Sequence, residues 1–139
     1  MTIKTITATA VAIPYAAPVG PYIGRGGLPG TLGAQGLIVK IETDSGLVGW
    51  GEGTGAFETD PNTVLAGRHT ADIENAITAL EDAGIGRGPM SGIEMALYDI
   101  VGKALGVPVY TLLGGRTREA IPLSHSIMFG SPREMADFA

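Results

Sequence analysis

Apolar and polar positions alternate along the first residues of the chain and predict a β-strand there. Ile6 and the alanines at the following even positions share one face, and the threonines share the other with Val11 and Ile13. A period of two is typical of a strand with one covered face. We expect this strand to run from Ile3 to Ile13 and to end at Pro14.

A second alternating stretch, LIVKIETDSGLVGWGE (residues 37–52), predicts a β-hairpin. Two β-rich runs flank Asp44-Ser45-Gly46. Glycine suits the left-handed position of a short hairpin loop, so Gly46 is expected in the turn.

Two segments rich in glycine and proline interrupt these strands and are interpreted as loops. They are residues 15–36 (YAAPVGPYIGRGGLPGTLGAQG) and residues 53–62 (GTGAFETDPN). We expect the 22 glycines of the chain to cluster in such loops. Long irregular segments of compact domains are usually functional or disordered.

Further along, apolar positions recur every three or four residues, as on the buried stripe of a helix. Thr70 is expected to cap one such helix, because threonine is a common N-cap residue. Gly84 and Gly86 are expected to end it. Its predicted buried stripe consists of Ile73, Ala76, Ile77 and Leu80.

The most regular helical pattern is SGIEMALYDIVGKAL, residues 91–105. Ser91 and Glu94 have the spacing of a capping box, and Met90 and Met95 have that of a hydrophobic staple. Gly102 on this helix suggests the close approach of another backbone.

The remaining segments predict shorter elements. Gly106 is expected to end the long helix, and PVYTLLGG (residues 108–115) to add a short helical turn. IPLSHSIMF (residues 121–129) is interpreted as a strand, and Ser131 and Pro132 as the cap and first residue of a last helix. The order predicts an α+β fold: a three-stranded antiparallel meander, a small helical bundle, and then the first βα step of a further structure.

The composition of the chain argues against several classes of function. The net charge of −5 argues against nucleic acid as a partner, because binding to phosphates requires a basic surface. The chain has no cysteine, which excludes disulfides and thiolate sites. Its N-terminus lacks the long apolar core of a signal peptide or membrane span, so we expect a cytoplasmic protein that does not bind membranes.

One motif formally matches a dinucleotide-binding fingerprint. GEGTGA (residues 51–56) follows a predicted strand, but FETDPN follows it in place of the helix whose N-terminus holds the pyrophosphate. We therefore favour a flexible loop and keep a dinucleotide-binding domain as the weakest of three functional hypotheses.

Other residues with catalytic potential favour structural interpretations. His69 and His125 lack carboxylates at metal-ligand spacing, and we expect His69 to flank a helix cap. Asp99 and Lys103 are spaced i, i+4, which favours a surface ion pair over a catalytic acid–base pair. Arg116 and Arg118 carry the charge needed to bind an anion. Arginines that are simply exposed to solvent on a loop are more common, so we favour that interpretation.

Two stretches together carry a family resemblance. VKIETDSGLVGWGEG (residues 39–53) resembles the hairpin of the N-terminal domain of the enolase superfamily, in its mandelate racemase/muconate lactonizing enzyme branch. SGIEMALYDIVGKALGVPVYTLLGG (residues 91–115) resembles the helix and turn of the same domain. Tyr98 stands where the family often has tryptophan.

The resemblance implies a domain organisation. In this family an α+β capping domain precedes a TIM-like barrel, so residues 1–119 would be the cap and residues 120–139 the first βα unit of a barrel cut short. Residues 122–129 would form its first strand. A complete barrel of this kind needs about 200 residues or more.

The resemblance also implies a chemistry. Family members depend on magnesium and remove the proton alpha to a carboxylate, with a lysine or histidine as base. Lys4, Lys40 and Lys103 are far apart, so the family's Lys-x-Lys pair is absent from this chain. We therefore expect no catalytic residue, no metal ligand and no bound cofactor here, with magnesium required by the full-length enzyme.

Substrate-binding residues are implied on two loops that close over the barrel mouth in the family. They would be residues 18–36 and 53–61, and the closed loops would exclude water. The implied substrate contacts are Tyr22, Ile23, Arg25, Thr54 and Phe57, with Ser124 and Ser126 on the first barrel strand. Arg25 is the natural partner of a carboxylate. Glu52 is expected to hold the hairpin and the cap together.

The main hypothesis is a capping fragment, inactive alone, of a homo-oligomeric racemase, dehydratase or cycloisomerase that acts on a small carboxylate. The alternative from another class is a stand-alone binding module that docks on a separate barrel subunit. Its barrel-facing residues would then form an exposed apolar patch.

Overall fold

The structure is a computed structural model that describes residues 1–14, 33–123 and 132–138. The chain divides into two compact units. The first contains residues 1–11 and 35–117, and the second contains residues 12–34 and 118–139. Most of the described helices and strands belong to the first unit.

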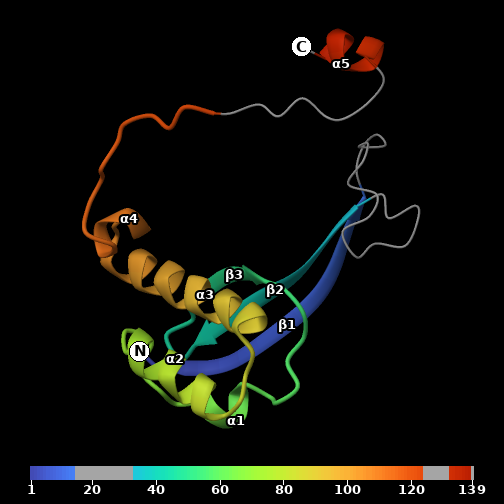
Figure 1. Cartoon of the computed structure of the whole chain (residues 1–139). Helices are drawn as coiled ribbons and strands as arrows, with labels where there is room; N and C mark the ends of the chain where they lie inside the picture. The colour runs from blue at the N-terminus through green and yellow to red at the C-terminus, as the bar shows by residue number, and fades with distance from the viewer. Residues whose placement is uncertain (15–32, 124–131, 139) are drawn as a thin grey trace. The chain divides into compact units, whose positions relative to one another are not determined.

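Three strands form one sheet in the order β1-β2-β3 (Figure 1). Their bounds are β1 Ile3–Pro14, β2 Gly33–Thr43 and β3 Val48–Gly53. Strands β2 and β3 pair antiparallel, with Leu37 opposite Gly53 and Glu42 opposite Val48. Gly46 has φ +85° in the connecting turn, which confirms the predicted hairpin.

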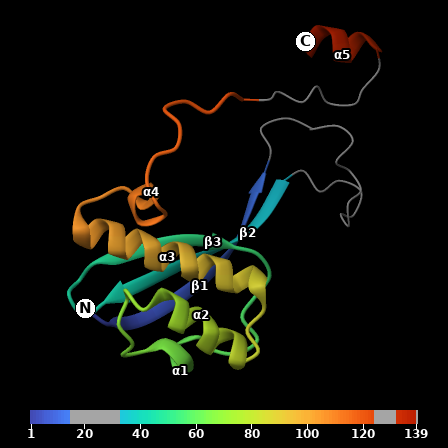
Figure 2. The same ribbon diagram turned by 60° about the vertical axis from the view of Figure 1, so that its left-hand side comes forward.

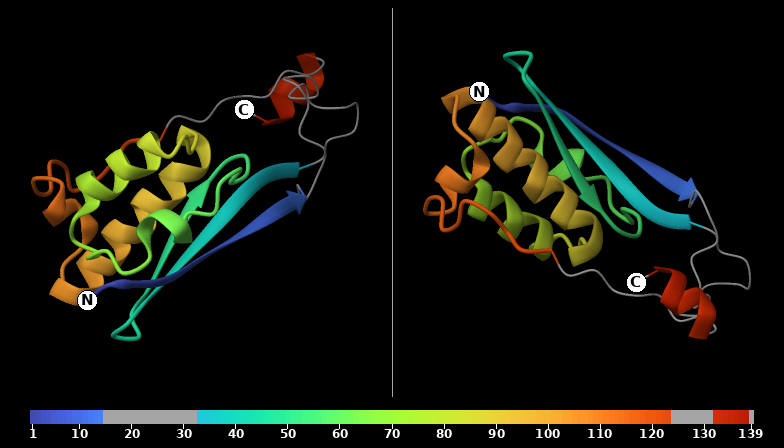
Figure 3. Two further views of the ribbon diagram at one scale, coloured as in Figure 1. Left: turned by 90° about the horizontal axis from the view of Figure 1, so that it is seen from below. Right: turned by 90° about the horizontal axis from the view of Figure 1, so that it is seen from above.

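The helices follow the sheet along the chain. They are α1 Asn62–Leu65, α2 Ile73–Asp82, α3 Arg87–Leu105, α4 Val109–Leu112 and, in the second unit, α5 Pro132–Phe138. Helices α2 and α3 lie side by side on one face of the sheet (Figures 2 and 3). The predicted α+β order of a three-stranded antiparallel meander and then helices is therefore confirmed.

The core lies between this face of the sheet and the helices. Alternate residues of β2 point into it, and Val39 and Ile41 are completely buried there. Helix α3 contributes the largest set of fully buried side chains, which are Ile93, Ala96, Leu97 and Ile100. This spacing is the predicted buried stripe of the long helix.

Strand β3 carries glycine at every second position, and these glycines face α3. A Cβ on Gly49 would lie 2.2 Å from the carbonyl oxygen of Ala96, and one on Gly51 would lie 2.0 Å from that of Gly92. A Cβ on Gly53 would lie 2.6 Å from the carbonyl oxygen of Gly88. The strand and the helix therefore touch backbone to backbone. The expectation that the glycines cluster in loops is wrong for this set, which serves packing within β3.

The start of α3 differs from the prediction. The helix begins at Arg87 after the N-cap residue Gly86, so Ser91 is inside it. The Ser91 hydroxyl donates to the carbonyl oxygen of Gly88 at 2.8 Å. The Ser91–Glu94 capping box is therefore wrong. The physical reason is tertiary packing, because the first turn must be helical to place Gly88 against Gly53.

The predicted staple between Met90 and Met95 is also wrong. Met90 is 6% exposed and belongs to the core, whereas Met95 is 53% exposed. With the helix starting a turn earlier, the two side chains lie on different faces of α3.

Thr70 does not cap α2, whose N-cap residue is Asp72. Thr70 is fully buried, and its backbone N–H donates to the carbonyl oxygen of Met1 at 3.3 Å. Its hydroxyl has no hydrogen-bond partner among the residues that the structure describes. Thr70 thus lies where the segment before α2 contacts the N-terminus, next to the isolated β-bridge between Thr2 and His69.

Other predicted boundaries are confirmed. Gly84 has φ +76° just past the end of α2, and Gly106 has φ +67° at the end of α3. Gly102 is approached by the carbonyl oxygen of Val107, which would lie 2.9 Å from an added Cβ. The backbone that closely approaches Gly102 is therefore that of Val107, where the chain turns back after α3.

Part of the predicted strand over residues 121–129 falls outside the described residues, and residues 121–123 are not in a strand. The predicted last helix is present as α5, while its expected cap Ser131 lies outside the described residues. Across the described ranges, none of the helices has the length and hydropathy needed to span a membrane.

Candidate functional site

The loop that follows β3, residues 54–61, is the described part of the implied substrate-facing surface. At its beginning, the backbone N–H of Thr54 donates to the carbonyl oxygen of Gly88 at 3.1 Å. Gly55 then turns the chain with φ +77°, a conformation that favours glycine. The loop therefore leaves the sheet in a direction set by the first turn of α3.

Asn62 fixes the other end of this loop to the edge of β1. Its side-chain oxygen accepts a hydrogen bond from the N–H of Ile6 at 2.8 Å, and its side-chain nitrogen donates to the carbonyl oxygen of Ile6 at 2.9 Å. This amide pairs with Ile6 as a neighbouring strand would. It also covers part of the edge of β1, whose start is covered by the hydrogen bonds of Ile3 with Gly67 and Arg68.

Asp60 orients Asn62 in turn. One carboxylate oxygen accepts from both the backbone and the side-chain nitrogen of Asn62, at 2.9 and 2.8 Å. These hydrogen bonds stabilise the charged carboxylate and hold the pKa of Asp60 below its usual value. The Asp-Pro-Asn segment is thus an anchor, whereas the sequence had suggested only a flexible stretch.

Asp44 in the hairpin turn makes a similar anchor at the start of β1. Its carboxylate accepts from the backbone N–H of Thr2 at 2.8 Å and from the Thr2 hydroxyl at 3.0 Å. The backbone hydrogen bond lowers the pKa of Asp44, and the hydroxyl adds to the effect.

The lowered pKa values of Asp60 and Asp44 predict that the free energy of unfolding falls at acidic pH. A carboxyl whose pKa is lower in the folded state stabilises the fold above its unfolded value of about 3.9, and this stabilisation is lost as pH falls through the folded value. Urea midpoints measured at pH 6 and pH 3 should therefore fall less in Asp60→Asn than in the parent chain. An equal fall in both proteins would contradict the assignment of Asp60.

The predicted site residues are only partly described. Thr54 is exposed at the start of the loop, and Phe57 is partly buried and packs against the core. Tyr22, Ile23, Arg25, Ser124 and Ser126 lie outside the described residues. Glu52 is exposed on β3, and its carboxylate would lie 3.3 Å from a Cβ on Gly36 of β2.

Asp99 and Lys103 form the expected i, i+4 ion pair, at 2.6 Å. The same Asp99 oxygen accepts from the backbone N–H of Trp50 at 2.9 Å, and Lys103 donates to the carbonyl oxygen of Val48 at 2.8 Å. The pair therefore joins α3 to the outer edge of β3. This structural role is more specific than a solvated surface pair and supports the non-catalytic interpretation.

Removing this connection should loosen the edge of β3. In Asp99→Ala, we expect the backbone amide of Trp50 to exchange with deuterium about tenfold faster, because a hydrogen bond to a charged acceptor is lost. NMR-detected exchange would measure it. Lys103→Met retains the Asp99 acceptor and serves as the control. If both variants leave the Trp50 rate unchanged, the connection is not stabilising.

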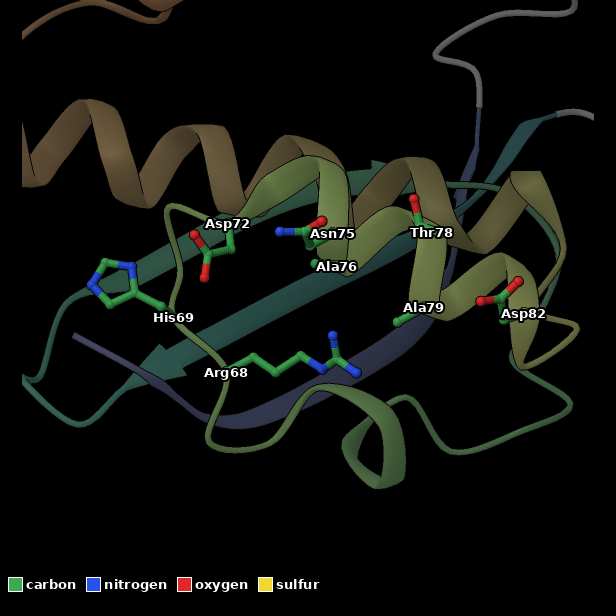
Figure 4. Close-up of a pocket in the computed structure, with 8 residues that line it drawn as sticks. All are labelled: Arg68, His69, Asp72, Asn75, Ala76, Thr78, Ala79 and Asp82. Carbon is green, nitrogen blue, oxygen red and sulfur yellow. The ribbon is translucent and has the colours of Figure 1, made fainter.

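A groove of about 450 Å³ lies along α2 (Figure 4). Its lining residues include Arg68 and His69 on the preceding segment, the N-cap residue Asp72, and Asn75 and Asp82 on the helix. The Nδ1 of His69 accepts from the backbone N–H of Ala71 at 3.2 Å, so this residue supports the chain before α2. The prediction that His69 flanks a cap at Thr70 is wrong, because the N-cap residue of α2 is Asp72. In the described ranges, no three His, Cys, Asp or Glu side chains are grouped to hold a metal ion.

The dinucleotide hypothesis loses its main support in the structure. Gly51 and Gly53 of the GEGTGA motif pack against α3, so their lack of side chains is explained by contact with Gly92 and Gly88. The next helix, α1, starts only at Asn62 and has four residues. A pyrophosphate site requires a helix N-terminus directly after the glycine-rich turn.

Residues 29–114 match the family described as mandelate racemase / muconate lactonizing enzyme, N-terminal domain. N-succinyl-L-Arg/Lys racemase of Bacillus cereus is 36% identical over 118 residues, which cover 74% of this chain and 32% of the racemase. Its crystal structure matches with a TM-score of 0.79 and 29% identity, over 99% of this chain and 40% of that chain.

Two further relatives have different activities. D-galactonate dehydratase of Pectobacterium atrosepticum is 44% identical over 99 residues, covering 61% of this chain and 26% of the dehydratase. Dipeptide epimerase of Enterococcus faecalis, solved with Mg and the dipeptide L-Leu-L-Tyr, matches with a TM-score of 0.68 and 27% identity, over 83% of this chain and 35% of that chain.

The chain thus spans between about a quarter and two fifths of the length of these relatives. The match includes the hairpin, α1, α2 and α3, which supply most of the buried apolar residues of the described core. The chain therefore belongs to the mandelate racemase/muconate lactonizing enzyme family of the enolase superfamily, as an N-terminal domain.

Proposed function

We propose that this chain is the substrate-capping part of a magnesium-dependent enzyme that removes the proton alpha to a carboxylate, with racemisation, dehydration or cycloisomerisation as the outcome. The observation that carries the proposal is the match over residues 29–114 together with the short share of each relative that the chain covers. Under this proposal, residues 1–119 form the cap and residues 120–139 begin a barrel.

The chemistry of such a reaction is assigned to residues beyond this chain. Magnesium stabilises the negative charge that develops on the carboxylate when the proton leaves. The described residues do not fit that ion, because they contain no suitable group of His, Asp or Glu side chains. The three lysines of the sequence are also far apart. We therefore assign neither the metal nor the base to this chain.

The cap contributes binding and the exclusion of water. Its loop over residues 54–61 is anchored by Gly88 at one end and by the Asp60–Asn62 pair at the other. A loop held at both ends keeps its central side chains in a defined direction, which suits a surface that closes over a substrate. We propose Thr54 and Phe57 as substrate contacts on this loop, with Tyr22, Ile23, Arg25, Ser124 and Ser126 on other segments.

Exchange of the α-proton tests this function. The 139-residue chain and a fusion of it to the remaining part of the Bacillus cereus racemase would each be incubated with N-succinyl-L-arginine in D2O, with and without Mg²⁺. We expect NMR to show Mg-dependent loss of the α-proton signal with the fusion only. Exchange catalysed by the chain alone would contradict the proposal, and so would a folded fusion that catalyses none.

The exposed apolar residues of α4 also fit the second candidate, a module that docks on a separate barrel subunit. Capture of a barrel protein by the native 139-residue chain, without covalent linkage, would support this candidate over the first.

A further inference from the structure

The outer edge of β3 is covered by side chains of α3. The Asp99 carboxylate accepts a hydrogen bond from the N–H of Trp50, and the Lys103 ammonium donates one to the carbonyl oxygen of Val48. These charged side chains satisfy backbone groups that a further strand would otherwise bind. Folded proteins block sheet edges in such ways because an unpaired edge is a template for another chain. This part of β3 is therefore closed to a partner strand.

The start of the outer edge of β1 is covered as well. Ile3 bonds to the segment before α2, and Asn62 binds both backbone groups of Ile6. Beyond Ile6 this cover stops, because none of the described residues outside the sheet bonds to the outer edge of residues 7–13. We call residues 7–13 the free edge. It ends at Pro14, which has no N–H to donate.

The free edge carries none of the residues that usually protect the edge of a sheet. Between Lys4 and Pro14 the sequence has neither a charged residue nor a proline, and in the free edge β-branched residues alternate with alanine. Backbone groups of alternate residues point to the same side of a strand, so those of Ala8 and Ala10 continue the outward direction set by Ile6. A strand of this composition with unpaired N–H and C=O groups favours pairing with another strand.

The hydrophobic core does not support this part of the sheet. Residues 7–10 of β1 and residues 34–35 of β2 are exposed. Figure 3 shows the ends of β1 and β2 running past the helices as a ribbon of two strands. Such a ribbon is marginally stable in water, whereas sheets of three or more strands are stable more often. A partner strand on the free edge would therefore stabilise the ribbon.

We propose that the free edge pairs with the free edge of a second copy of this chain, antiparallel and about a two-fold axis at Ala10. Because residues 7–13 are centred on Ala10, this register places Ala8 opposite Ala12 of the other copy. The two edges exchange backbone hydrogen bonds at these alanines. An edge that pairs with itself needs no second type of surface, as in other two-fold interfaces. The two ribbons then form one sheet in the order β2-β1-β1-β2.

Charge and side-chain shape favour a second copy as the partner. The chain has a net charge of −5, so two copies approach most readily where both surfaces are uncharged. Lys4 lies outside the paired segment, and no like charges face each other within it. Thr9 lies opposite Val11 of the other copy, and pairs of β-branched residues across strands are favourable. This inference is independent of the proposed function, because it concerns the sheet of the domain alone.

Charges introduced at Ala10 test the proposal in the 139-residue chain. A contact of this size is weak, so sedimentation equilibrium would be run at up to about 0.5 mM, where we expect the parent chain to form a dimer. Its mass would be twice 14.2 kDa. Ala10→Lys and Ala10→Glu should each weaken dimerisation about fivefold or more, because like charges then meet at the two-fold axis. An equimolar mixture of the two variants should dimerise again, because opposite charges then face each other.

Ala71→Lys is the matched control, since it adds a charge at an exposed position before α2. It should leave dimerisation unchanged. A monomeric parent chain would overturn the inference. So would a dimer that neither charge at position 10 weakens, because the contact would then lie elsewhere. A mixture of the two variants that stays monomeric would also overturn it.

Amide exchange in the parent chain gives a second readout that needs no variant. The amides of Ala8 and Ala10 should exchange with deuterium more slowly as the chain concentration rises, because they become bonded in the dimer. The amide of Ile6 should not respond, because Asn62 already binds it. Protection of Ala8 and Ala10 that is already complete in dilute, monomeric chain would contradict the proposal, since the chain itself would then cover the edge. Exchange at both sites that is independent of concentration would do the same.

Discussion

Gly51→Ala is expected to destabilise the domain by about 3 kcal/mol or more, because the new methyl group would overlap backbone atoms. It would lie 2.0 Å from the carbonyl oxygen of Gly92 and 2.9 Å from the backbone nitrogen of Ala96. Neither atom can rotate away as a side chain would. Relief requires β3 and α3, which share an extensive contact, to separate. Urea unfolding followed by circular dichroism would measure the loss.

Gly86→Ala is the matched control for this prediction. Gly86 has φ −65° and the nearest atom to an added Cβ is 4.0 Å away, on Pro89. We expect a loss below about 1 kcal/mol, the usual effect of alanine at an N-cap. If Gly51→Ala were as stable as Gly86→Ala, the backbone contact between β3 and α3 would be disproved.

Leu97→Ala is expected to lower the free energy of unfolding by about 3 kcal/mol, because it leaves a cavity in the core. Leu97 is completely buried and is among the largest fully buried side chains of the described residues. It lies between Ile93 and Ile100 on the face of α3 that covers the sheet. The same urea titration measures this effect.

Met95→Ala, on the same helix, provides the contrast. Met95 is 53% exposed, so its truncation should cost less than about 0.5 kcal/mol. Met95→Ala also tests where α3 begins. A staple to Met90 would make Met95→Ala clearly destabilising, and a large loss would contradict the present register of the helix.

The elements were predictable because each is encoded by neighbouring residues. The alternation from Ile3 onward, the turn at Gly46 and the helical stripe of residues 93–105 depend on local pattern alone. The family resemblance was predictable for the same reason, since it rests on the hairpin and the long helix, two continuous stretches.

The N-caps of α2 and α3 were not predictable because packing between distant segments decides them. Ser91 has the spacing of a cap residue, but α3 extends one turn further to place Gly88 against Gly53. Thr70 resembles a cap in sequence and is instead buried next to Met1. In both cases the competing contact lies far away in the chain.

In the described part of the candidate site, contacts between distant segments were likewise not predictable from the sequence. Thr54 and Phe57 were proposed as site residues through the family resemblance, whereas Asn62 and its hydrogen bonds to Ile6, 56 positions away, were missed. The Asp-Pro-Asn sequence was the available signal, because Asp and Asn side chains often bond to the backbone two residues on. Its partner on β1 could not be read from sequence.

The most direct test of the central claim is the intact mass of the native protein isolated from its source. We expect a mass of about two and a half to three times 14.2 kDa, because 99% of this chain covers 40% of one relative and 61% of it covers 26% of another. Such a mass would mean that this domain is the cap of a longer enzyme. A native protein of 14.2 kDa would contradict that account and leave a cap without its own barrel.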